Sequence, residues 1–196
     1  MKVVLDTSVL VFLASPNAPS PIDPETGKHV EHCQERVEGL LEDLDKENVQ
    51  LIIPTPVLSE LLIQARDRQI EILAALTNKK SVQIVPFDQA AAVENAALRR
   101  SKISKKSRGE TKKEVSFDLQ ILAIARVTGA KVILSDDDQL RKRAAKAGMT
   151  VHGIADLDLP DSKRQISLFF DASADDRNDT SAVDPESSAD DKEISE

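Results

Sequence analysis

Four acidic positions that are far apart in the chain stand beside or within apolar segments. Asp6 follows a short apolar run, Glu60 lies in an apolar helical pattern, and Asp118 has apolar residues on both sides. The fourth position lies in Asp136-Asp137-Asp138, just after another apolar run. Singly, Asp6 and Asp118 could cap helices and Glu60 could face solvent. Together, carboxylates in apolar surroundings need a shared partner, and Mg²⁺ or Mn²⁺ would provide one.

Short apolar runs alternate with helical patterns and would position these acids. We expect strands over residues 3–5, 51–53, 82–85, 132–134 and 150–152. Helices are expected over 55–66, 88–100, 117–127 and 138–147, the first and third capped by Thr55 and Ser116. This alternation predicts an α/β fold, a three-layer α/β/α sandwich around a mostly parallel sheet of four or five strands. If the first and fourth strands are neighbours, the acids that follow them meet at one edge.

The acidic motifs resemble those of PIN-domain proteins, the ribonuclease fold of VapC-type toxins. The matching pieces are Leu5-Asp6-Thr7-Ser8-Val9-Leu10, Glu60, Phe117-Asp118-Leu119-Gln120-Ile121 and Leu134-Ser135-Asp136-Asp137-Asp138-Gln139-Leu140. They occur in the family's order, and the resemblance spans residues 1–158, which we interpret as a nuclease domain. It also suggests a homodimer and an antitoxin that blocks the site.

The resemblance implies metal-dependent hydrolysis of RNA, with catalytic Mg²⁺ or Mn²⁺ held by Asp6, Glu60, Asp118 and one acid of the last motif. In the family that motif has a small hydroxyl residue, a variable position and then an acid. The pattern points to Asp137 here, although Asp136 could take the role. Thr7 or Ser135 could orient a ligand or a water molecule. The alternative is a non-catalytic PIN-like module that only binds RNA or a protein.

The net charge of −8 belongs to the C-terminal tail. Residues 171–196 hold ten acids and two bases, so the rest of the chain is neutral overall. The tail has few large apolar residues, so the apolar surface it could bury would not offset the conformational entropy lost on ordering it. We therefore expect a disordered acidic tail over 171–196, preceded by a C-terminal extension over 159–170.

One part of the neutral body is strongly basic. Residues 99–113, here called the basic segment, contain a single acid, Glu110, and eight bases: Arg99, Arg100, Lys102, Lys105, Lys106, Arg108, Lys112 and Lys113. We interpret the segment as a solvated loop that contacts the RNA backbone. Further bases on the next helix would extend this surface, namely Arg141, Lys142, Arg143 and Lys146.

Several other classes of protein are disfavoured. The six glycines form no Walker A or dinucleotide-binding motif, and Ser8 stands where phosphatases of similar architecture carry a second aspartate. No apolar stretch is long enough to span a membrane, and the single Cys33 suggests a cytoplasmic protein. His29 and His32 with Cys33 do not complete a zinc site. Residues 16–28 contain four prolines and should form an extended surface loop, either a tolerated insertion or a rim over the site.

Overall fold

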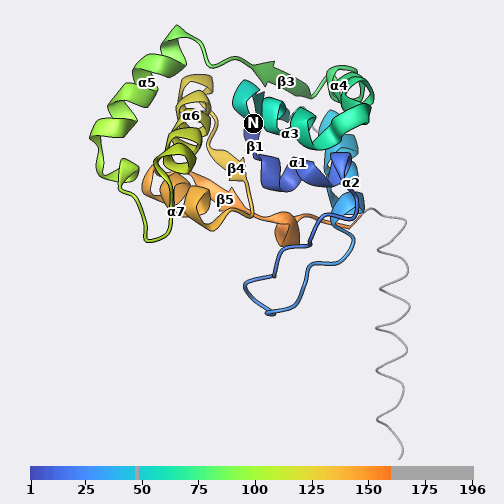
Figure 1. Cartoon of the computed structure of the whole chain (residues 1–196). Coiled ribbons are helices and arrows are strands. Elements are labelled where there is room, and N and C mark those ends of the chain that lie inside the picture. The colour runs from blue at the N-terminus through green and yellow to red at the C-terminus, as the bar shows by residue number, and fades with distance from the viewer. Residues whose placement is uncertain (47–48, 160–196) are drawn as a thin grey trace, which may run out of the picture. The chain divides into compact units, whose positions relative to one another are not determined.

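Five short parallel strands form the central sheet. The computed structural model describes residues 1–46 and 49–159 (Figure 1). The strands are β1 (Lys2–Leu5), β2 (Gln50–Pro54), β3 (Val82–Val85), β4 (Val132–Leu134) and β5 (Thr150–His152). They pair in parallel in the order β3-β2-β1-β4-β5. The predicted α/β fold with a mostly parallel sheet is confirmed.

Helices cover both faces of this sheet. They are α1 (Thr7–Ala14), α2 (Cys33–Lys46), α3 (Thr55–Ala65), α4 (Gln69–Thr77), α5 (Gln89–Arg100), α6 (Lys112–Thr128) and α7 (Asp138–Lys146), with 3₁₀ turns η1 (Arg66–Arg68), η2 (Lys102–Ser104) and η3 (Ile154–Asp156). Figure 1 shows α1 to α4 on one side of the strands and α5 to α7 on the other. The strand order accounts for this arrangement, because strands are added first on one side of β1 and then on the other, and crossovers between parallel strands are right-handed as a rule.

The direction of strand addition reverses between β1 and β4. These two strands are neighbours, with Leu5 in register with Leu134. The Asp6 backbone N–H donates to the Leu134 carbonyl at 3.0 Å, so the chain leaves both strands at the same edge. Ligand sites of open α/β sheets form at such a reversal. The acids that follow β1 and β4 are therefore brought together as expected.

The core is formed by the central strands and by α6. Leu5, Ile52 and Leu122 have no exposed surface. Strands covered on both faces need continuous apolar sequences, which β1, β2 and β4 have. Asp118 is the one charged side chain among the buried residues of α6. That carboxylate therefore lies against the core rather than on the surface.

Helix α6 begins earlier than the sequence suggested. The Thr111 hydroxyl accepts a hydrogen bond from the Glu114 backbone N–H, and the Glu114 carboxylate accepts one from the Thr111 backbone N–H. These two hydrogen bonds form a capping box at the start of the helix. The prediction that Ser116 is the N-cap is wrong, and Asp118 lies in the helix interior instead of at its start. The basic segment is also not one long loop, because α5 reaches Arg100, a 3₁₀ turn follows, and α6 starts at Lys112.

Other boundary predictions need smaller corrections. Thr55 is the first residue of α3 and Pro54 is its N-cap, whereas the sequence suggested Thr55 as the cap. Residues 16–28 form a loop, and Ile22 within it bridges to His29 just after it. No helix in the described part of the chain is long and apolar enough to cross a membrane. The predicted acidic tail, and all but the first residue of the predicted extension, lie outside the described residues.

Candidate active site

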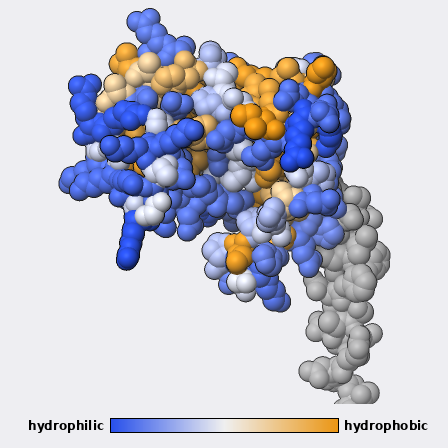
Figure 2. Space-filling view, viewed as in Figure 1, coloured by the Kyte–Doolittle hydropathy of each residue, from blue (hydrophilic) through white to orange (hydrophobic). Residues whose placement is uncertain are grey.

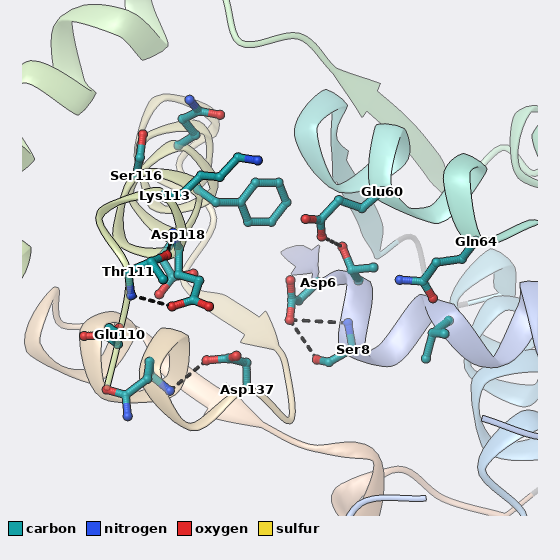
Figure 3. A pocket seen from close by; sticks show the side chains of 16 residues that line it. Asp6, Ser8, Glu60, Gln64, Glu110, Thr111, Lys113, Ser116, Asp118 and Asp137 are labelled. Carbon is teal, nitrogen blue, oxygen red and sulfur yellow. Dashed lines mark hydrogen bonds between the residues drawn. The ribbon is translucent and has the colours of Figure 1, made fainter. Parts of the chain in front are cut away.

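A pocket of about 890 Å³ opens at the carboxyl edge of the sheet (Figure 3). Carboxylates from four separate elements line it: Asp6 after β1, Glu60 in α3, Asp118 in α6 and Asp137 at the start of α7. In Figure 3, Asp118 and Asp137 lie on one side of the pocket, and Asp6 and Glu60 lie on the other. Four of the acids singled out in the sequence therefore face one space.

Asp6 is held by hydroxyl groups. Its side chain is buried, and its Oδ2 accepts hydrogen bonds from the hydroxyls of Ser8 at 2.7 Å and Ser135 at 2.8 Å. It also caps α1 through the Ser8 backbone N–H, so the N-cap interpretation holds alongside the site. Burial raises the pKa of Asp6, although these hydrogen bonds oppose the rise.

Thr7 and Glu60 face each other across α1 and α3. The Thr7 hydroxyl donates to Glu60 Oε2 at 2.9 Å and so sets the direction of that carboxylate. Partial burial raises the pKa of Glu60, and the charge of Asp6 adds to the rise. The two acids are thus near enough to repel each other when both are ionised.

Asp118 is paired with an arginine that the sequence did not connect to it. Its Oδ2 lies 2.7 Å from Nη1 of Arg143, whose side chain is 3% exposed. Burial, with a contribution from the charges of Asp137 and Asp6, raises the pKa of Asp118 to about 7, although Arg143 opposes the shift. The expectation that Arg143 extends the RNA-binding surface is wrong, because this guanidinium is buried.

The same arginine binds Glu110, the single acid of the basic segment. Nη2 of Arg143 donates to Glu110 Oε2 at 2.7 Å. Hydrogen bonding from Arg143 lowers the pKa of Glu110 to about 2. Sequence reasoning missed this pair, but a signal was present. Arg143 shares one buried face of α7 with Leu140 and Ala144, where an arginine needs an acidic partner.

The three aspartates of the last motif have different surroundings. Asp137 lines the pocket and caps α7, with Oδ1 accepting from the backbone N–H groups of Gln139 and Leu140 at 2.7 and 2.8 Å. Asp136 does not line the pocket, and it accepts from the Ile154 N–H at 3.3 Å. The Asp138 side chain is 84% exposed. Of the three, Asp137 is the one placed with the other acids.

Ser135 and Ser8 connect the two strand ends at the pocket. The Ser135 hydroxyl is fully buried, donates to Asp6 and accepts from the Asp137 backbone N–H at 3.0 Å. Ser8 accepts from the Asp136 backbone N–H at 3.0 Å. The sequence suggested a supporting role for Ser135 and missed the one that Ser8 has.

The basic segment lies beside the pocket. Lys113 lines it directly. A second pocket of about 230 Å³ is lined on the next face of α6 by Arg99, Lys106 and Lys112. Lys105, Arg108 and Arg100 are exposed but line neither pocket.

The carboxylates suit a hard divalent ion but are not gathered around one point. Within residues 1–46 and 49–159, no three His, Cys, Asp or Glu side chains are close enough together to hold an ion as they stand. Mg²⁺ and Mn²⁺ take carboxylate and water oxygens, and Mg²⁺ often uses one or two carboxylates with water and substrate phosphate. The residues therefore fit an open site that water and phosphate complete.

The remaining predicted features lie elsewhere. His29 contacts the Ser20 carbonyl at 3.1 Å, His32 contacts Glu35 at 3.3 Å, and the buried Cys33 thiol donates to the Val30 carbonyl. None of residues 16–28 lines the pocket, so the suggestion that this loop forms its rim is not supported.

The fold and the pocket define an α/β/α domain with acids at the carboxyl edge of a parallel sheet. The model of the PIN domain family matches residues 29–146, which is more than half of the chain. The chain belongs to the PIN domain family, as the motifs suggested.

The solved structures with a similar fold include the following two. A chain in VapBC2 from Rickettsia felis, bound to a DNA fragment from their promoter, has 17% identity and a TM-score of 0.50, and the match covers 78% of this chain and 98% of that one. A chain of FitAB bound to an IR36 DNA fragment has 19% identity and a TM-score of 0.51, and the match covers 80% of this chain and 97% of that one. No curated protein sequence matches the chain significantly. At these identities the similarity shows the shared fold.

Proposed function

We propose that the chain is a divalent-metal-dependent endoribonuclease, with Asp6, Glu60, Asp118 and Asp137 as ligands of Mg²⁺ or Mn²⁺. One observation carries the proposal: these four carboxylates come from four elements and line one pocket. Membership of the PIN domain family supports it, and each motif that carries the resemblance contributes an acid to this pocket.

The side chains around the pocket would each have a defined task. A bound divalent ion would supply an activated water near neutral pH and offset negative charge on the phosphate. Ser8 and Ser135 fix the orientation of Asp6, and Thr7 fixes that of Glu60. Hydrogen bonds that set the direction of a carboxylate in advance reduce the reorganisation that cation binding requires.

The basic segment would hold the RNA backbone beside the acids. Lys112 and Lys113 are consecutive in the first turn of α6 and line the second and first pockets respectively. Lysines at a helix N-terminus oppose the helix dipole, so their position is better explained by an anionic ligand than by helix stability. Phosphates of one RNA strand would pass over this turn, between the two pockets.

A protein partner is also part of the proposal. Figure 2 shows apolar surface over α3 and α4, where Ile63, Ile70 and Leu73 are exposed. Exposed apolar side chains on adjoining helices are typical of protein interfaces. We propose that an antitoxin or a second copy of the chain binds here, in keeping with the resemblance to VapC-type toxins.

The direct test is cleavage of a labelled single-stranded RNA by the purified chain with Mn²⁺, in parallel with EDTA. Asp6→Asn and Asp118→Asn should each reduce the rate roughly 100-fold or more. The last motif offers a matched pair, because Asp137 lines the pocket and its neighbour Asp138 is exposed. Asp137→Asn should lose activity and Asp138→Asn should keep it. Equal cleavage by wild type and the Asp6 and Asp118 variants would contradict the proposal.

A non-catalytic binding module is the second candidate. It is favoured by the spacing of the acids, since no described trio is close enough to hold an ion, and by the pairing of Asp118 with Arg143. RNA binding without cleavage, and without Mn²⁺ binding in calorimetry, would establish this alternative.

A further inference from the structure

Arg143 is a buried cation shared by two carboxylates at the edge of the pocket. Its Nη1 lies 2.7 Å from Asp118 Oδ2 and 2.6 Å from Glu110 Oε1, and its Nη2 lies 2.7 Å from Glu110 Oε2. Asp118 is one of the acids proposed to bind metal, whereas Glu110 belongs to the basic segment. One side chain of α7 therefore joins the segment proposed to contact RNA to the acids proposed to hold the ion.

The same contacts shape the turn over residues 105–110. The Ser107 backbone N–H donates to Glu110 Oε2 at 2.5 Å, and Arg143 Nη2 lies 3.5 Å from the Lys105 carbonyl. Gly109 has a φ of 92°, a left-handed conformation that favours glycine, just before Glu110 enters the interior. The turn is thus fixed to α7 from within, while its basic side chains remain exposed.

We propose that Arg143 is a positioning residue that couples the basic segment to Asp118, so that changes at Glu110 alter how tightly Asp118 binds a divalent ion. The inference rests on the proposed function, because it takes Asp118 as a metal ligand. An ion at Asp118 competes with Arg143 for that carboxylate, and Glu110 offers Arg143 another partner. Glu110 therefore favours ion binding, and by linkage ion binding should tighten the turn.

The first measurement is calorimetric titration of the full chain with Mn²⁺. Glu110→Gln leaves Arg143 with Asp118 as its remaining charged partner and should weaken Mn²⁺ binding about fivefold or more. Glu114→Gln is the matched control, because Glu114 also lines the pocket but contacts Thr111 instead of Arg143. Glutamine keeps the capping box, so this variant should stay within about twofold of wild type. Equal weakening by both variants would overturn the inference.

A double-mutant cycle separates coupling from simple loss of negative charge. With Arg143→Met present, Glu110→Gln should change the Mn²⁺ dissociation constant by less than about twofold. An undiminished effect of Glu110→Gln in that background would mean that Glu110 acts on the ion directly, and it would overturn the proposal. The double variant removes a buried opposite pair together, so it folds more readily than Arg143→Met alone. Thermal melting checks the fold of each variant.

Hydrogen exchange supplies a readout that needs no metal. Arg143→Lys keeps the charge but loses the planar fork, so the amides of residues 105–110 should exchange faster than in wild type. Mn²⁺ should slow the same amides in wild type and leave them unchanged in Asp118→Asn. Unaltered exchange in Arg143→Lys would overturn the proposal. A wild-type chain that does not bind Mn²⁺ would instead refute the proposed function, and the coupling with it.

Discussion

The raised pKa of Asp118 predicts that metal binding weakens in mild acid. Burial moves this carboxyl from its ordinary value of 3.8 to about 7. Below its pKa the group is protonated, and a metal must displace that proton before binding the carboxylate. The ionised fraction falls from about nine in ten at pH 8 to about one in ten at pH 6, so the Mn²⁺ dissociation constant should rise roughly tenfold. An ordinary aspartate would give almost no change over this range.

Calorimetric titrations with Mn²⁺ at pH 6, 7 and 8 measure the effect. The raised pKa values of Asp6 and Glu60 act in the same direction. Asp118→Asn should bind more weakly and give a flatter pH profile, while the exposed Asp138→Asn should keep the wild-type profile. Equal affinity of the wild-type chain at pH 6 and pH 8 would refute the assignment of Asp118 as a buried ligand.

Two further results are expected. Replacing Lys105, Lys106 and Arg108 with alanine should weaken RNA binding and reduce the slope of log K against log salt by about 2, if each contacts one phosphate of a single strand. Replacing Lys79, Lys80 and Lys131, which lie outside the basic segment, should leave the slope unchanged, and an equal loss in both sets would contradict the proposed RNA path. Ser135→Ala removes a fully buried hydroxyl that joins Asp6 to the Asp137 backbone and should cost about 1–3 kcal/mol in urea unfolding. The exposed Ser59→Ala is its control, and equal stability of the two variants would contradict the bridging role of Ser135.

The sheet could be predicted because its strands are short apolar runs with clear limits. Residues 82–85, 132–134 and 150–152 are strands as expected, and the other two are longer by one or two residues. The start of α6 was missed because Ser116 and Thr111 are both capable N-caps. Thr111 with Glu114 is a capping-box pattern, but it lies among lysines that suggested a loop. The reciprocal hydrogen bonds between Thr111 and Glu114 favour the earlier start.

The site was predictable in its residue types and less so in their contacts. The strand pattern placed Asp6 and the acids after residue 134 at one edge of the sheet, whereas the resemblance to PIN-domain proteins added Glu60 and Asp118 to the site. The role of Arg143 depends on which face of α7 meets α6, and the charge pattern of a helix alone does not reveal this. Asp136 and Asp137 are adjacent, yet the turn after β4 directs one toward Ile154 and the other into the pocket. That difference arises from tertiary structure.

A crystal structure with Mn²⁺, using the anomalous signal of the metal, would show whether the four carboxylates hold an ion. We expect metal density in the pocket within bonding distance of carboxylate oxygens drawn from Asp6, Glu60, Asp118 and Asp137, with water at the remaining positions. Metal density confined to other surfaces, or a pocket without metal at saturating Mn²⁺, would contradict this expectation.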